Sequence, residues 1–154
     1  HAVEIYNTAS DIETARPDGT YLLDQLLCEG HRLTAYAADD AHFKRRDFGG
    51  GWMMVKAEAN DPDALLEAMK AGAFYSSQGP DIHDIAIDGG EIEVATSPAV
   101  TVAALGRGTR SAVRDGRQIT RARLPLDTFA SDWLRIVVTD AAGKRAWSNP
   151  IWLD

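Results

Sequence analysis

The first 75 residues alternate between short apolar runs and segments in which apolar residues recur with helical spacing. Three apolar runs predict buried strands, at 2–7, 32–38 and 52–57. Two segments predict helices, at 21–29 and 61–71; Asp61 and Pro62 suit the start of the second, and a glycine follows each. The polar stretch 8–17 is expected to be a loop. Apolar strands separated by helices are typical of parallel β/α architecture.

The hydrophobic pattern changes after residue 78. From Ile82 onward, short strand-like segments are separated by Gly, Asp and Pro, as in DIAI-DGG-EIEVAT-SP-AVTVAAL. This even spacing predicts an antiparallel, Ig-like β-sandwich, although the cysteine pair of antibody domains is missing. With a boundary near Gly79–Pro80, we expect two domains, an α/β part over 1–78 and an all-β part over 79–154.

The α/β part is too short to close a barrel by itself. Two or three β/α units cannot bury both faces of a sheet, and a complete β/α barrel takes about 250 residues. The chain also begins directly in a strand-like run. We therefore expect this part to be the last units of a β/α barrel, cut from a longer protein, and we do not count His1 as a ligand.

Composition narrows the classes of partner. A net charge of -7 argues against nucleic acid, because phosphate backbones attract clustered Lys and Arg. No apolar run approaches the roughly 20 residues that span a bilayer, so no membrane partner is expected. Cys28 is the only cysteine, which excludes an internal disulfide and a CxxC metal site. These features fit a soluble globular protein and indicate no compartment.

The chemistry-bearing residues gather directly after the strand predicted over 32–38. Asp40 and His42 are two residues apart, so their side chains can point the same way and converge on one ion. An oxygen and a nitrogen ligand together suit Zn, Mn or Fe. Asp39 points elsewhere and could orient His42 or a bound water. The residues leave an alternative open, a polar surface turn, because a D-x-H triplet is a weak pattern by itself.

Four further residues are candidates for roles around such a site. Glu4 and Asn7 flank a predicted strand end, where they either form a solvated edge or support the metal ligands and contact substrate. Lys44 and Arg45, with Arg46 beside them, either bind a phosphate group or belong to a solvated loop.

Other conspicuous residues receive structural interpretations. His83 is expected at the surface or at an interface, and 75–77 (YSS) is interpreted as a linker without a histidine base nearby. The tryptophans Trp133, Trp147 and Trp152 are expected to pack the sandwich core or its junction with the first part. If they were exposed in a row, they would instead form a carbohydrate-binding platform.

Five segments, in order, resemble a known family. AVEIYN, LLCEGHRL, AYAADDAHF, GGGWMMVKA and LLEAMKAGAFYSSQGPDI are similar to the C-terminal part of PHP (polymerase and histidinol phosphatase) superfamily phosphoesterases. The resemblance covers residue 2 to about residue 83. The final β part is similar to the small β domain that follows the PHP barrel in some bacterial members.

The resemblance implies a distorted β/α barrel with two or three metal ions at its C-terminal face. The last ligand motif of the family, D-x-H, corresponds to Asp40 and His42. The H-x-H motif, the acidic ligand and the mid-chain histidines of the family have no counterpart here, and neither His31 nor His83 lies in such a context. The parent protein is thus expected to hydrolyse a small phosphorylated substrate with Zn, Mn or Fe. This fragment alone is expected to be inactive and to bind metal weakly or not at all.

A second class of function stays open, a non-catalytic binding or structural module in which the α/β part is only a base for the sandwich. Asp40 and His42 at an open strand end favour the hydrolase, whereas aromatic residues in a row on the sandwich favour the module. A truncated sheet leaves apolar edges and faces exposed, so self-association through sheet surfaces is expected.

Overall fold

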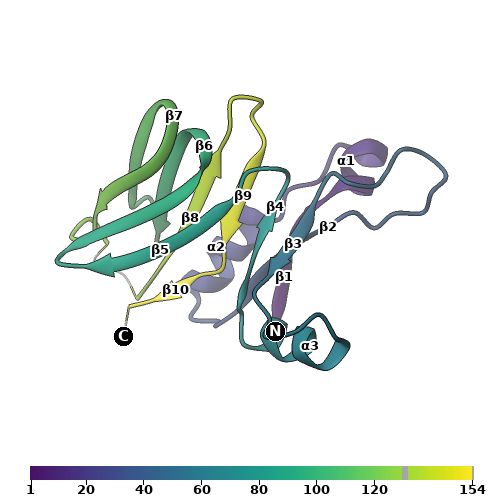
Figure 1. Ribbon diagram of the computed structural model, residues 1–154, viewed down its shortest axis with the longest axis horizontal. Helices are drawn as coiled ribbons and strands as arrows, with labels where there is room; N and C mark the ends of the chain where they lie inside the picture. The colour runs from purple at the N-terminus through teal and green to yellow at the C-terminus, as the bar shows by residue number, and fades with distance from the viewer. Residues whose placement is uncertain (130–131, 154) are drawn as a thin grey trace.

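A computed structural model describes residues 1–129 and 132–153, which form two sheets and three helices (Figure 1). The helices are α1 Thr8–Thr14, α2 Thr20–Cys28 and α3 Pro62–Lys70. The strands are β1 Ala2–Asn7, β2 Thr34–Ala38, β3 Trp52–Val55, β4 Phe74–Ser77, β5 Ile82–Asp88, β6 Glu91–Gly106, β7 Ser111–Pro125, β8 Trp133–Thr139, β9 Arg145–Ser148 and β10 Ile151–Trp152. None of the helices in the described ranges has the length and apolar character needed to cross a bilayer.

The smaller sheet consists of β1 and β2, which pair in parallel from Ala2 opposite Thr34 to Asn7 opposite Ala38. The crossover between them contains α1 and α2, and α2 packs its buried Leu23 and Leu27 against the sheet. The parallel β/α arrangement expected over 1–78 is confirmed for β1, the two helices and β2. It was wrong for the strand predicted over 52–57, because β3 pairs antiparallel with β4 in the larger sheet. Because β1 and β2 are parallel, their carboxyl ends lie at the same edge.

The expectation of a loop over 8–17 was wrong, because α1 occupies most of it, from Thr8 to Thr14. The side-chain oxygen of Asn7 accepts a hydrogen bond from the Ser10 amide at 2.8 Å, which is the usual N-cap interaction. Ala15 ends the helix in the left-handed conformation, at φ 55°. A seven-residue helix with this polar sequence shows no apolar period, so only its cap could have revealed it.

The other two helices follow the predicted boundaries closely. The Asp61 carboxylate accepts hydrogen bonds from the amides of Asp63 and Ala64, and Pro62 occupies the first helical position of α3. None of the residues of α3 is buried, and its Leu66 and Met69 side chains are 48% and 36% exposed. The apolar face of α3 is therefore only partly covered.

The larger sheet is antiparallel, has eight strands and is not closed. Its order is β3-β4-β9-β8-β6-β5, with β7 paired to β6 and β10 paired to β8 (Figure 1). The antiparallel β structure expected for the second half of the chain is confirmed. The expected break at Ser97–Pro98 was wrong: β6 continues through it, and the pairing register with β7 shifts between Ala95 and Ala99. Such a bulge accommodates a proline that cannot donate to the ladder.

The larger sheet extends across the boundary expected near residue 79. β3 and β4 precede the boundary, and β4 pairs with β9 through Tyr75 opposite Ser148 and Ser77 opposite Ala146. The interpretation of 75–77 as a linker was wrong, since these residues lie in β4 and Ser76 and Ser77 are buried.

An apolar cluster joins the smaller sheet to the larger one. Trp133 and Trp147 lie 0% and 3% exposed in the same cluster as Ile5, Leu23 and Leu27. The Tyr6 and Trp147 rings stack with their centroids 6.1 Å apart. The expectation that these two tryptophans pack at the core or junction is confirmed, and neither offers an exposed face to a carbohydrate.

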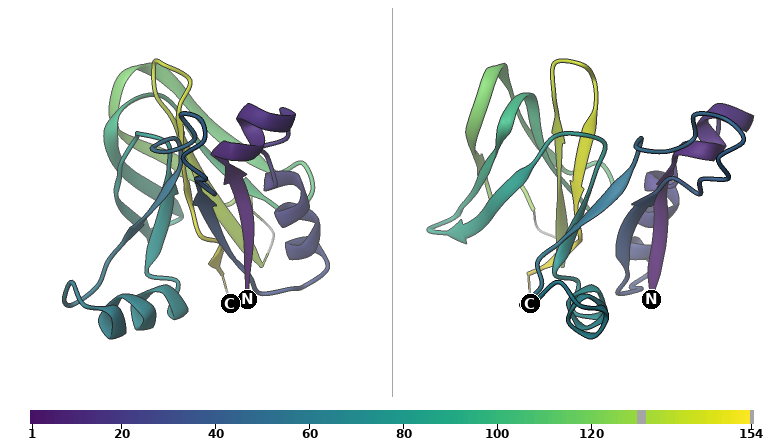
Figure 2. Two further views of the ribbon diagram at one scale, coloured as in Figure 1. Left: turned by 90° about the vertical axis from the view of Figure 1, so that its right-hand side faces the viewer. Right: turned by 45° about the vertical axis from the view of Figure 1, so that its right-hand side comes forward.

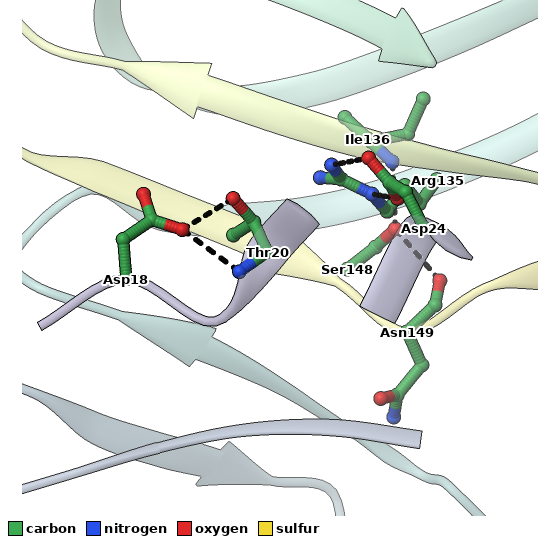
Figure 3. Close-up of polar contacts among 7 residues, drawn as sticks. All are labelled: Asp18, Thr20, Asp24, Arg135, Ile136, Ser148 and Asn149. Carbon is green, nitrogen blue, oxygen red and sulfur yellow. Dashed lines mark hydrogen bonds and ion pairs between the residues drawn. The ribbon is translucent and has the colours of Figure 1, made fainter. Parts of the chain in front are cut away.

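Polar contacts fix the same junction. The Arg135 guanidinium on β8 donates two 2.7 Å hydrogen bonds to the Asp24 carboxylate on α2 (Figure 3). The Ser76 hydroxyl accepts from the Ala37 amide and donates to the Ala35 carbonyl, so β4 satisfies part of the free edge of β2 with a side chain. The Asn149 side chain accepts from the Ala35 amide at 2.8 Å. These contacts hold α2 and β2 against the larger sheet.

Candidate functional site

The loop over residues 39–51 connects β2 to β3 and begins at the carboxyl ends of the parallel strands. It extends beside α1, at the opposite end of the smaller sheet from the amino terminus (Figures 1 and 2). Loops at this edge of a parallel sheet are the usual place for binding and catalytic residues. We name residues 39–51 the β2–β3 loop.

The Asp39 carboxylate anchors both ends of the β2–β3 loop. One oxygen, Oδ1, accepts from the Thr8 hydroxyl at 2.7 Å and from the Gly50 and Gly51 amides at 3.0 and 2.9 Å. The other oxygen, Oδ2, accepts from the Gly49 amide at 2.5 Å. The partners found for Asp39 are thus the loop and α1. The predicted role in orienting His42 or a water stays a prediction.

Gly50 and Gly51 are required because the β2–β3 loop lies so close to β1 and α1. A Cβ added at Gly50 would lie 2.6 Å from Thr8 Oγ1, and one added at Gly51 would lie 2.7 Å from Tyr6 Cδ1. Any side chain there would push the loop away from β1 and α1 and break the hydrogen bonds to Asp39. The glycine run therefore fits the loop against the smaller sheet.

The hydrogen bonds keep Asp39 ionised. Partial burial raises the pKa of this carboxyl, but the bonds from Thr8 and the three glycine amides outweigh burial and hold the pKa below its ordinary value. Asp39 is therefore ionised more readily than an ordinary aspartate.

Asp47 is a second anchor, and the sequence analysis missed it. Its side chain is buried, and its two oxygens accept from the His42 amide at 2.9 Å and from the Phe43 amide at 3.2 Å. The His42 amide bond lowers the pKa of Asp47, and desolvation opposes that shift only in part. The sequence did contain a signal for this role. Asp47 follows the predicted turn by a few residues, and aspartate side chains often accept hydrogen bonds from turn amides.

Asp40 and His42 lie between the two anchors, and both are exposed to solvent. Asp40 has a left-handed backbone, at φ 52°. No three His, Cys, Asp or Glu side chains come together as a metal-binding group anywhere in residues 1–129 and 132–153. Metal sites in proteins usually have three or more protein ligands. Among the described residues, Asp40 and His42 could therefore contribute to a metal site only together with further ligands.

Glu4 and Asn7 interact with each other. The Asn7 side-chain amide donates to Glu4 Oε2 at 3.2 Å, while its oxygen caps α1. Glu4 lies opposite Tyr36 in the parallel pair. Burial and then the Glu4 charge raise the pKa of the Tyr36 hydroxyl. Asn7 ends β1, whereas Glu4 lies in the middle of this strand. The predicted support of metal ligands or substrate by both residues stays a prediction.

The tip of the loop combines cationic and aromatic side chains. Lys44, Arg45 and Arg46 are exposed. Phe43 and Phe48 are 77% and 54% exposed, and their rings contact each other with centroids 5.9 Å apart. The structure thus gathers Lys44 and Arg45 on the same loop as Asp40 and His42, in a chain whose net charge is -7. His83 is exposed on β5, outside this loop.

Comparison with known proteins returns no match of any of three kinds: no family model, no curated protein and no solved structure matches this chain.

Proposed function

We propose that this chain is the C-terminal part of a metal-dependent phosphoesterase of the PHP type, with the smaller sheet as the last β/α unit of its barrel. Asp40 and His42 would supply two ligands of its metal site. The observation that supports this most is their exposure on an anchored loop at the carboxyl ends of two parallel strands. A loop held by two carboxylates can present ligands with little loss of conformational entropy on binding.

The chemistry of the ligands suits Zn, Mn or Fe, and further ligands would come from outside this chain. In such sites the metal ions polarise the phosphoryl group and activate water. The part of this chain is to hold Asp40 and His42 in place and to bring Lys44 and Arg45 to the negative charge of a small phosphorylated substrate. Nucleic acid and membrane are not proposed as partners.

The non-catalytic alternative receives less support. Its distinguishing feature would be a row of exposed aromatic side chains on the larger sheet, and Trp133 and Trp147 are buried. Self-association stays a proposal for the partly covered sheet and helix surfaces.

Two measurements test the proposal. The purified chain with Mn²⁺, Zn²⁺ or Fe²⁺ should release no phosphate from p-nitrophenyl phosphate, and turnover that EDTA abolishes would contradict its inactivity alone. In the full-length product of its gene, Asp40→Ala and His42→Ala should each lower kcat/KM for a phosphate ester at least 100-fold, about 2.7 kcal/mol of transition-state stabilisation.

His83→Ala is the matched control, since His83 is also an exposed histidine but lies on β5. It should leave kcat/KM unchanged. A full-length protein that hydrolyses no phosphate ester, or that loses as much activity in His83→Ala as in His42→Ala, would overturn the proposed function.

A further inference from the structure

β5 and β7 form the two outer edges of one part of the larger sheet. β6 lies between them and pairs antiparallel with both. Within the described ranges, neither β5 nor β7 pairs with any strand other than β6. Figure 1 shows these three strands on the side of the molecule away from β1 and β2. Both outer edges therefore carry backbone N–H and C=O groups that could pair with another strand.

The edge formed by β5 is acidic. Asp84 and Asp88 are exposed on β5, and the exposed Glu91 follows them at the start of β6. None of these three carboxylates forms an ion pair with a residue of the described ranges. Residues 82–85 border a cavity of about 580 Å³, so no strand covers this half of the edge. β5 thus presents uncompensated negative charge along an open edge.

The edge formed by β7 is basic, although the net charge of the chain is -7. Arg110 lies just before β7, Arg114 and Arg117 lie within it, and all three are exposed. No ion pair in the part of the chain that the structure describes involves these three arginines. The carboxylate of β7 itself, Asp115, accepts a hydrogen bond from the Thr101 hydroxyl at 2.9 Å. The edge of β7 therefore carries an excess of positive charge.

The pairing register places charged side chains of both edges on the same face of the sheet. Asp84 on β5 and Arg121 on β7 both lie opposite Ala95 of β6. Arg123 lies opposite Glu93, and directly opposite side chains share a face. The Glu93 carboxylate forms ion pairs with both Arg121 and Arg123, whose side chains are 65% exposed. One carboxylate thus serves two guanidinium groups, and this face stays basic along β7.

The charges decide which edges of two copies can meet. If β5 paired with β5, or β7 with β7, like charges would lie side by side, which destabilises a strand pair. If β5 of one copy pairs with β7 of another, carboxylates lie beside guanidinium groups. Because the charged side chains of both edges share a face, this arrangement continues the same face from one copy to the next.

We propose that the free edge of β5 pairs with the free edge of β7 on a second copy of the chain, with Asp84 and Asp88 beside the β7 arginines. Two different edges meet, so the contact is heterologous and can repeat from copy to copy. One strand pair is a small interface, and we expect a dissociation constant of about 100 µM. This inference specifies the surface for the self-association proposed above and does not rest on the phosphoesterase function.

The wild-type chain provides the first test. In sedimentation equilibrium, its average mass should rise between about 20 µM and about 1 mM protein. Adding about 0.5 M NaCl should weaken the association about fivefold, because salt screens exposed charges. In amide NMR spectra recorded on dilution, signals of β5 and β7 should shift, and signals of β1 and β3 should stay.

Charge reversal identifies the two edges. Asp84→Lys combined with Asp88→Lys makes both edges basic. Arg117→Glu combined with Arg121→Glu makes β7 acidic and leaves Arg123 in its ion pair with Glu93. Neither double variant should associate alone, whereas an equal mixture of the two should associate again. A variant that unfolds cannot restore association on mixing, so this recovery separates charge from folding.

Glu13→Lys combined with Glu58→Lys is the matched control. It changes the net charge as much as the β5 double variant does, at exposed residues outside both edges. It should associate like the wild type.

Three results would overturn the inference. The first is a wild-type chain that stays monomeric at about 1 mM. The second is a set of dilution shifts on β1 or β3 in place of β5 and β7. The third is a mixture of the two folded double variants that stays monomeric while the control associates.

Discussion

Asp24→Ala is expected to lower the free energy of unfolding by about 3 kcal/mol, because it leaves the Arg135 charge buried without its partner. The Arg135 side chain is only 4% exposed, and both of its 2.7 Å hydrogen bonds to Asp24 would be lost (Figure 3). The Asp24 side chain is 33% exposed, so water can enter and keep the loss at the lower end of the range for buried pairs.

Urea unfolding followed by tryptophan fluorescence measures this loss. The matched control is Glu67→Ala, which breaks the exposed 3.1 Å pair with Lys70 and should cost less than about 0.5 kcal/mol. A second variant separates charge from packing: Asp24→Leu combined with Arg135→Met should recover most of the stability. Equal losses in Asp24→Ala and Glu67→Ala would contradict the role assigned to the buried pair.

Asp39→Asn is expected to open the β2–β3 loop and to cost about 2–3 kcal/mol of stability. Asp39 Oδ1 accepts three hydrogen bonds, and Oδ2 accepts one from the Gly49 amide. An asparagine keeps one acceptor oxygen, so its NH₂ group must face an N–H donor. Hydrogen exchange should show that the amides of residues 49–51 lose protection before the rest of the chain.

Asp40→Asn is the matched control for Asp39→Asn. It removes the neighbouring charge and retains a residue that tolerates the left-handed backbone found there. Stability and the exchange rates of the glycine amides should stay close to those of the wild type. If Asp40→Asn opened the loop as Asp39→Asn does, charge and not hydrogen bonding would hold it.

The contribution of Asp39 should depend on pH in a defined direction. Its pKa is lower in the folded protein than the ordinary value of about 3.9. The stabilisation is therefore complete above the unfolded-state pKa and is lost as pH falls through the folded-state pKa. The stability difference between wild type and Asp39→Asn should be full at neutral pH and should shrink below about pH 4.

The parts of the fold that could be predicted are those with local signals. The capping residue Asp61 and the apolar period revealed α3, and period and stop glycine revealed α2. β4 was missed because Ser76 and Ser77 look like surface residues. They are buried because Ser76 bonds the β2 backbone and Ser77 bonds the Pro80 carbonyl. Such contacts depend on tertiary structure, which no local pattern contains.

The candidate site, like the fold, could be predicted only where the sequence carries a local signal. The position of Asp40 and His42 after a strand of a parallel pair followed from the sequence pattern. The anchoring by Asp39 could not be predicted, because its partners Thr8 and Gly50 are 31 and 11 residues away. Asp47 was overlooked beside the more conspicuous Lys44–Arg46 run, although its partners are local.

Asp40 and His42 are proposed as metal ligands, and a Mn²⁺ titration of the chain followed by NMR tests this proposal most directly, because paramagnetic broadening detects even weak binding. Paramagnetic broadening should reach the imidazole of His42 at lower Mn²⁺ concentration than those of His31 and His83, and Asp40→Asn should weaken this effect. The claim would be contradicted if His31 or His83 broadened at the same or lower concentration, or if Asp40→Asn left the broadening of His42 unchanged.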